Sequence, residues 1–332
     1  MTRLSDLVQQ SNQEAVHPDS RCSTHNKEPT GIAVTPSMLS TVVPEIDWYQ
    51  RASLELQGIK RAVQTGQPWV VNELVEIASG IVVALGADNK LLQSVLQRDA
   101  EDYLIRNAVN VAILSVKIAG ALGYEPMKLE EVALAGLLHD LGMFVLPDTL
   151  VYKSGALTEA ELQDMRAHPE HGARLFEAFE TAYPRVGRVI QQEHERQDGS
   201  GYPNRLPGDQ VDEMAFVIGL ADMFDALMSP RPYRRGMSPH LAIRTLLVHG
   251  KKIFPHHLLK GLIEQLSIYP LGTTVRLNTG EVGVVDQLNR QYPLRPILRV
   301  PQEAGSGDAR PSRTVDMRAE TSLHIVEVVP LG

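Results

Sequence analysis

The spacing of hydrophobic residues changes several times along the chain. Residues 1–44 carry scattered prolines and single charges without a sustained period, which predicts a disordered tail. Between residues 45 and 97 apolar positions recur at helical spacing, for example at Trp48, Ala52, Leu56 and Ile59. This stretch predicts a helical lead-in.

Residues 98–268 then predict one helix after another. Gly123 gives a stop signal, and Thr158 with Glu161 forms a capping box that opens a helix. The segment before His139 becomes apolar on all sides, as expected of a deeply buried helix. The predicted helices cover 103–122, 127–138, 158–179, 184–195, 213–227, 238–249 and 255–266.

After Pro270 the apolar residues alternate, which is typical of strands. Residues 275–277 and 282–285 predict a hairpin around Thr279-Gly280, and 297–300 and 322–329 predict further strands. A loose loop is expected at 302–312. The sequence therefore predicts a mainly α protein: a helical bundle at 98–268, its lead-in, and a small C-terminal β domain at 269–332.

Composition narrows the classes of protein that fit. The chain has 332 residues, 43% of them hydrophobic and 22% charged, which is typical of a globular protein. No membrane span is expected, because no run approaches the length of an uncharged apolar span. The N-terminus lacks an apolar h-region, so no secretory signal is expected. The one cysteine, Cys22, excludes an internal disulfide framework and a cysteine-based zinc site, and we expect a cytoplasmic protein. A net charge of −8 argues against nucleic-acid binding but leaves room for a small anion.

Several ionisable residues stand at predicted helix ends or inside apolar segments. Helices of a bundle can aim such side chains at one point, the usual design of a metal site in a bundle. Taken alone, His139 and Asp140 also fit a histidine hydrogen-bonded to a carbonyl and a capping aspartate. Glu193 and His194, taken alone, fit a charged surface patch. The candidates are His139, Asp140, His168, Glu193, His194 and Asp222.

Asp222 is the least expected of these residues, because it lies within the apolar run 215–224. A buried carboxylate is either paired or metal-bound, so the alternatives are an arginine partner and a metal ion, and we favour the metal. Asp225, one turn on, is placed to orient it. Of two histidines one turn apart, we choose His168 as the ligand and expect His171 on a solvated face.

Imidazole and carboxylate ligands without thiolate suit iron or manganese, with zinc less favoured. An aspartate such as Asp140 can bridge two ions with its two oxygens. Two neighbouring divalent ions would polarise a phosphate and generate a hydroxide for in-line attack, which predicts hydrolysis of a phosphate ester. The nearby arginines Arg231, Arg234 and Arg235 agree with a phosphate substrate, and a surface loop with scattered charge is the alternative.

Taken together, these residues resemble the HD-GYP family, a bacterial branch of the HD phosphohydrolases. The matching strings follow the family order over about half of the chain. They are His-Asp-Leu-Gly at 139–142, His-Pro-Glu-His-Gly at 168–172, His-Glu-Arg-Gln-Asp-Gly-Ser-Gly-Tyr-Pro at 194–203, Ala-Asp-Met-Phe-Asp-Ala-Leu at 221–227 and Arg-Pro-Tyr-Arg at 231–234.

The resemblance implies a metal-dependent phosphodiesterase that hydrolyses cyclic di-GMP to linear pGpG or GMP. It implies metal ligands at His139, Asp140, His168, His194 and Asp222, to which we add Glu193. Asp140, Asp222, Arg231 and Arg234 are the expected catalytic residues. The resemblance also implies substrate contacts from Tyr202, Arg231 and Arg234. The Gly201-Tyr202-Pro203 loop matches the signature loop, which in this family can also contact diguanylate cyclase domains.

The chain departs from the family at four positions. Asn107 stands where the family has a metal-binding histidine on the first helix, and an amide oxygen is a weaker ligand. Tyr103 replaces an acidic residue associated with a third metal, so we expect two ions. Met143 replaces a lysine, which removes a cation near the phosphate. Glu193 replaces the first of two adjacent histidines and can still bind iron or manganese.

Two functions therefore compete. The first is the cyclic di-GMP phosphodiesterase. The alternative is a catalytically weak or inactive HD-GYP module that binds nucleotide or a partner protein and signals through the lead-in, which Asn107 and Met143 favour. A homodimer through the lead-in helices fits either hypothesis, and the β domain is expected to be a structural or interaction appendage.

Overall fold

The computed structural model describes residues 46–97, 102–229, 236–237, 239–266, 269, 271–289, 292, 294–301 and 312–329. Contacts divide the chain into two units, residues 1–47 and 48–332. The predicted tail at 1–44 lies outside the described residues, as do Arg231, Arg234 and Arg235 and nearly all of the predicted loop at 302–312. Every described helix and strand belongs to the second unit.

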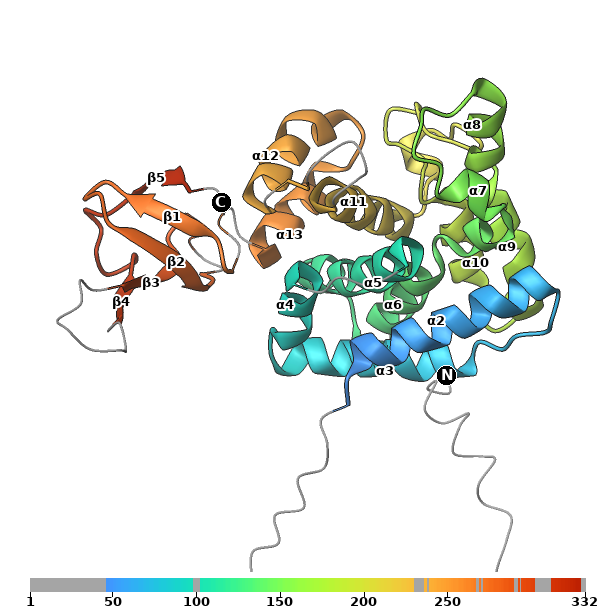
Figure 1. Cartoon of the computed structure of the whole chain (residues 1–332), viewed down its shortest axis with the longest axis horizontal. Coiled ribbons are helices and arrows are strands. Elements are labelled where there is room, and N and C mark those ends of the chain that lie inside the picture. The colour runs from blue at the N-terminus through green and yellow to red at the C-terminus, as the bar shows by residue number, and fades with distance from the viewer. Residues whose placement is uncertain are drawn as a thin grey trace, which may run out of the picture. The chain divides into compact units, whose positions relative to one another are not determined.

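The lead-in forms three helices: α2 (Trp48–Thr65), α3 (Asn72–Ala87) and α4 (Lys90–Gln97). Helix α2 buries Tyr49, Ala52, Leu56 and Ile59, which recur every three or four residues and so share one face. Helix α2 packs against both α3 and α5 (Tyr103–Ala121). The predicted helical lead-in is therefore present, and Figure 1 shows α2 and α3 lying together beside α5.

Helix α5 is the central helix of the bundle. It packs against α2, α3, α4, α6, α11 and α13, and its residues 104–119 are all buried. It is also long and apolar enough to cross a membrane, whereas the sequence analysis expected no segment of that kind. Because 89% of the apolar window is buried inside the structure, α5 has the surroundings of a core helix.

The remaining helices surround α5 or support the candidate ligands. Asp212 caps α11 by accepting a hydrogen bond from the Met214 N–H, and Arg185 grips the same carboxylate with two nitrogens. The segments are α6 (Pro126–Leu138), η2 (Leu141–Val145), α7 (Asp148–Val151), α8 (Glu159–Arg166), α9 (His168–Phe176), η3 (Glu177–Phe179), α10 (Pro184–Gln192), η4 (Gly208–Gln210), α11 (Glu213–Met228), α12 (Pro239–His249), η5 (Gly250–Lys252) and α13 (His256–Leu266).

The single helix expected at 158–179 is wrong, because the chain breaks at Ala167 into α8 and α9. The capping box of Thr158 and Glu161 is confirmed at the start of α8. Pro169 explains the break: it has no N–H to bond the Met165 carbonyl four residues earlier, and it is well suited to the first turn of α9. His168 fills the gap, since its Nδ1 lies 2.7 Å from the Met165 oxygen.

The C-terminal part is a five-stranded antiparallel sheet in the order β4-β3-β2-β1-β5. The strands are β1 (Thr274–Leu277), β2 (Val282–Gln287), β3 (Ile297–Pro301), β4 (Ser312–Asp316) and β5 (Ile325–Val328). The predicted hairpin is confirmed, with Gly280 at φ +89° in the turn. Strand β4 was missed, and β5 is shorter than the expected 322–329. The mainly α prediction with a small C-terminal sheet is confirmed.

Candidate metal centre

Four candidate ligands converge from three places in the bundle. Asp140 follows α6, His168 begins α9, and Glu193 and His194 follow α10. One ligand atom from each lies within 4.8 Å of all the others. The Nε2 atom of His168 is 3.2 Å from Glu193 Oε1 and 3.1 Å from His194 Nε2. This spacing is what a shared cation requires of its ligands.

Close packing of glycines allows this convergence. A Cβ on Gly142 would overlap the His168 carbonyl, so η2 and α9 can touch only with glycine there. A Cβ on Gly136 would lie 2.6 Å from Ala112 Cα, so the contact between α6 and α5 also requires a glycine. The glycine that follows His139-Asp140 in the sequence therefore sets how near Asp140 lies to His168.

Backbone carbonyls orient two of the histidines. The Nδ1 atom of His139 lies 2.8 Å from the Gly136 oxygen, and that of His168 lies 2.7 Å from the Met165 oxygen. A carbonyl can only accept, so each Nδ1 carries the hydrogen and each neutral ring presents its Nε2 lone pair to the cluster. The expected carbonyl contact of His139 is thus present, and it prepares the ring as a ligand.

Asp140 lies between two groups of candidate ligands. Its Oδ1 is 3.3 Å from His168 Nε2, and its Oδ2 is 3.4 Å from His139 Nε2. Asp222 adds its Oδ1 at 3.9 Å from the same nitrogen of His139. Asp140 precedes η2 but makes no capping hydrogen bond, so its carboxylate is committed to these neighbours. Through its second oxygen, Asp140 connects the four-residue cluster to His139 and Asp222.

Glu193 is completely buried, although the sequence alone suggested a charged surface patch. Its Oε1 contacts the Nε2 atoms of His168 and His194 at 3.2 and 3.1 Å. Its Oε2 is buried and has no hydrogen-bond partner among the described residues, as is also true of His139 Nε2. Buried polar atoms without partners are costly, and a cation next to each of them would satisfy it.

The charges of the cluster shift the titration of its members. Burial opposes charge on His139, but the three neighbouring carboxylates raise the pKa of His139 to about 9. Against the same burial, Glu193 and the nearby aspartate raise the pKa of His168. Burial, followed by the charge of His168, lowers the pKa of His194 well below the ordinary histidine value. Burial raises the pKa of Glu193. The raised pKa values of His139 and His168 favour protons on these rings, and such protons balance part of the carboxylate charge that a divalent ion would otherwise balance.

Asn107 of α5 approaches the Asp222 side. Its Nδ2 donates to Asp222 Oδ1 at 3.1 Å and to Asp225 Oδ2 at 2.9 Å. Asp225 therefore acts on Asp222 through Asn107 and does not bind it directly. The Asn107 Oδ1 is buried and has no partner among the described residues, so it is available as a ligand. Asn110 donates to Asp225 Oδ1 at 2.7 Å, a contact that the sequence analysis missed.

The Gly201-Tyr202-Pro203 loop lies against the cluster. The Tyr202 ring stacks on the His194 ring, with centroids 4.5 Å apart, and the Arg166 guanidinium is 5.6 Å from the Tyr202 centroid. The buried carboxylate of Glu195 holds the loop by accepting hydrogen bonds from the Asn204 and Leu206 N–H groups. The sequence pattern alone predicts no role for Glu195. His171, for which a solvated face was expected, is half-buried and lies outside the cluster.

Comparison with known proteins identifies the domains of the chain. Residues 90–254 match the model of the HD domain, and residues 274–331 match that of a KOW domain associated with HD domains. An HDG"Y"P protein from Bdellovibrio bacteriovorus has the same helical fold, with a TM-score of 0.54 and 21% identity over 67% of this chain and 73% of that one.

A cyclic di-GMP phosphodiesterase of Pseudomonas aeruginosa is 33% identical over 260 residues, which are 78% of this chain and 62% of that protein. The chain belongs to the HD-GYP family. A 3'3'-cGAMP-specific phosphodiesterase of Vibrio cholerae is 30% identical over 46% of this chain and 30% of its own length. This HD-GYP chain thus spans less than two thirds of either curated relative.

Two of the residues that depart from the HD-GYP pattern make contacts away from the candidate ligands. Met143 packs against the helical core, and the Tyr103 ring lies 5.6 Å from the Arg106 guanidinium.

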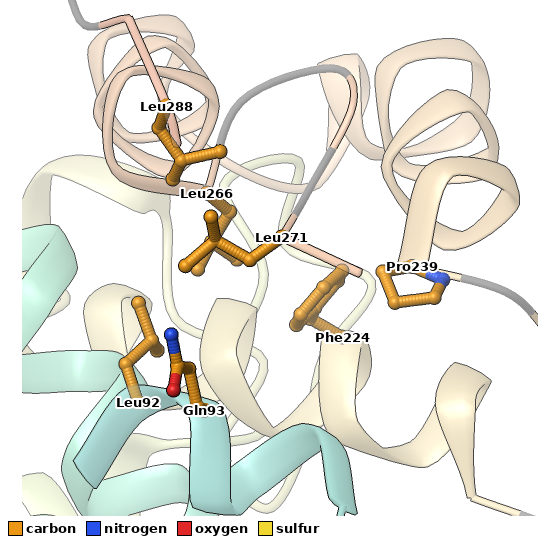
Figure 2. A pocket seen from close by; sticks show the side chains of 7 residues that line it. All are labelled: Leu92, Gln93, Phe224, Pro239, Leu266, Leu271 and Leu288. Atoms are coloured by element: carbon orange, nitrogen blue, oxygen red, sulfur yellow. The ribbon is translucent and has the colours of Figure 1, made fainter. Parts of the chain in front are cut away.

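Figure 2 shows a separate pocket, which contains none of the candidate ligands. It is lined by Leu92, Gln93, Phe224, Pro239, Leu266, Leu271 and Leu288, so this apolar pocket is no part of the metal centre.

Proposed function

We propose that this chain is a metal-dependent phosphodiesterase that hydrolyses cyclic di-GMP to linear pGpG or GMP in the bacterial cytoplasm. The observation that carries the proposal is Asp140, whose two oxygens face His168 on one side and His139 on the other at 3.3 and 3.4 Å. A carboxylate placed in this way suits two neighbouring ions. The name of the Pseudomonas aeruginosa relative supports the choice of substrate.

The residues present fit two divalent ions. Asp140, His168, Glu193 and His194 would hold one of them, and Asp140 with His139, Asp222 and the Asn107 oxygen would hold the other. Three buried atoms without partners fit this assignment: Glu193 Oε2, His139 Nε2 and Asn107 Oδ1. The nitrogen and oxygen donors favour iron or manganese over zinc.

When bound, such ions would polarise the phosphate and lower the pKa of water. The chain supplies the shape around them. Tyr202, stacked on His194, would border the bound nucleotide, and Arg231 and Arg234 would contact its phosphates. We further propose that the Gly201-Tyr202-Pro203 loop contacts diguanylate cyclase domains and that the lead-in helices form a homodimer.

A non-catalytic module that binds nucleotide or a partner protein is the alternative. One observation favours it: the Asn107 amide nitrogen is turned toward Asp222, where the family presents an imidazole lone pair. Met143 supplies no cation where the family has a lysine. The first feature weakens the Asp222 side, the second removes a cation near the phosphate, and neither replaces a ligand of the cluster around His168.

The two functions separate in one experiment. The full chain is purified anaerobically, loaded with iron or manganese, and incubated with cyclic di-GMP and, in parallel, with 3'3'-cGAMP, while products are followed by chromatography. Linear pGpG or GMP from the parent, and from the exposed control Asp164→Asn, but not from Asp140→Asn, supports the phosphodiesterase. Bound metal and nucleotide without product would select the binding module. Turnover of 3'3'-cGAMP alone would overturn the substrate.

A further inference from the structure

A continuous line of hydrogen bonds joins the lead-in helix α2 to the Asp222 side of the metal centre. The Tyr49 hydroxyl donates to Asn110 Oδ1 at 2.9 Å, and Asn110 Nδ2 donates to Asp225 Oδ1 at 2.7 Å. The other oxygen of Asp225 accepts from Asn107, whose same nitrogen reaches Asp222. The line crosses α2, α5 and α11.

These side chains lie where water cannot replace a lost partner. Tyr49 is 3% exposed, Asn110 and Asp225 are 2% exposed, and Asn107 is fully buried. Asp225 is a buried carboxylate and therefore needs its amide donors. Because the Tyr49 hydroxyl donates to Asn110 Oδ1, the Asn110 Nδ2 remains directed at Asp225. The position of α2 thus bears on the orientation of Asp225.

We propose that Tyr49 is a positioning residue for the Asp222 side, acting through Asn110, Asp225 and Asn107, so that α2 sets how tightly that side holds its cation. The inference rests on the two-ion centre of the proposed function. It predicts an asymmetry: no described hydrogen bond links the Tyr49 hydroxyl to the cluster of Asp140, His168, Glu193 and His194, so loss of that hydroxyl should leave the affinity of this cluster unchanged.

The anchoring of α2 supports a coupling of this kind. Lys60, on the same helix, binds Asp102 at 2.7 Å and the Tyr152 hydroxyl at 2.8 Å. Asp102 caps the start of α5 by accepting from the Leu104 N–H. Helix α2 therefore grips α5 at its N-terminus and again at Asn110, one turn from Asn107. A shift of α2 relative to α5 would be felt at both points.

The test is the substitution Tyr49→Phe, which removes one hydroxyl and keeps the ring. Tyr124→Phe is its matched control, because the Tyr124 hydroxyl also joins the end of α5 to α11, through Glu213, at the ends far from Asp222. Metal-free full-length proteins are titrated with Mn²⁺ by calorimetry, and their thermal unfolding is recorded. These measurements need no turnover.

We expect Tyr49→Phe to weaken one of the two Mn²⁺ equivalents about 3–10-fold and to leave the other unchanged, since more direct partners of ligands contribute about 10–100-fold. Asp225→Asn, nearer the site, is expected to reach that larger range and carries the test if Tyr49→Phe does not fold. Raising Mn²⁺ should restore parental kcat in Tyr49→Phe. Tyr124→Phe should keep both affinities even where its melting temperature falls.

Parental Mn²⁺ affinities in a folded Tyr49→Phe, or the same weakening in Tyr124→Phe, would overturn the proposal. A parent that binds two equivalents but hydrolyses no cyclic nucleotide overturns the proposed activity and leaves the positioning role standing. A parent that turns over substrate while Tyr49→Phe keeps both affinities overturns only the positioning role. A parent that binds a single equivalent overturns both.

Discussion

Replacing Glu193 by glutamine gives the sharpest separation of a metal ligand from a structural carboxylate. The side chain is fully buried, and its Oε1 touches two imidazole nitrogens at 3.2 and 3.1 Å. Its Oε2 has no partner among the described residues. Glutamine keeps the shape and removes the charge. We therefore expect metal binding to weaken, while the stability of the metal-free protein is kept or rises.

The magnitudes follow from these contacts. Leaving a buried polar oxygen unpaired costs about 1–3 kcal/mol, so metal-free Glu193→Gln is expected to be as stable as the parent or more stable by up to about that amount. The gain should be larger at pH 8 than at pH 5, because a raised carboxyl pKa destabilises the fold increasingly as pH rises above its unfolded value. Loss of a charged ligand should weaken metal binding at least about 100-fold, or about 2.8 kcal/mol.

The assay combines thermal unfolding of the metal-free protein with Mn²⁺ titration of the same samples. Glu170→Gln, a partly exposed glutamate paired with Arg174, serves as control and should change neither quantity appreciably. A Glu193→Gln protein that binds Mn²⁺ like the parent would refute the assignment of Glu193 as a ligand. One that loses stability without metal would refute the claim that the cost of burying its charge exceeds the stabilisation that the neighbouring histidines provide.

Three further outcomes are expected. Asn107→His should tighten binding of the Asp222-side Mn²⁺ equivalent about 10-fold, since imidazole is the better ligand, while overpacking lowers the free energy of unfolding by about 1–3 kcal/mol. A Mn²⁺ titration that shows no tightening would contradict the assignment of Asn107. Pro169→Ala should restore an N–H that competes with His168 for the Met165 carbonyl. Although alanine is the better helix former, release of His168 should lower Mn²⁺ affinity about 10-fold, and an unchanged affinity would contradict this role of Pro169. Because the pKa of His139 is raised from 6.5 to about 9, its contribution to metal-free stability is complete below pH 6.5 and is lost as pH rises through about 9; pH-dependent melting should show this decline, and His139→Asn should reduce it.

Much of the fold could be predicted from local patterns. The apolar face of α2, the capping box of α8 and the hairpin at Gly280 are encoded by residues close together in the sequence, and the structure has all three. The break at Ala167 was also encoded locally, by Pro169, but the strong capping signal upstream outweighed it. Strand β4 was missed because its exposed positions gave little hydrophobic alternation, and its pairing with β3 supplies the regularity.

The sequence by itself determined the residue types of the candidate site, their order, and the absence of thiolate ligands. Only the tertiary structure decided which of them meet. Burial of Glu193 and the two-sided environment of Asp140 depend on three helix ends meeting where glycines allow contact. The path from Tyr49 to Asn107 joins positions 58 residues apart through Asp225 on a third helix. Spacing along a chain carries local periodicity, whereas hydrogen bonds between separate helices arise only once the helices have packed.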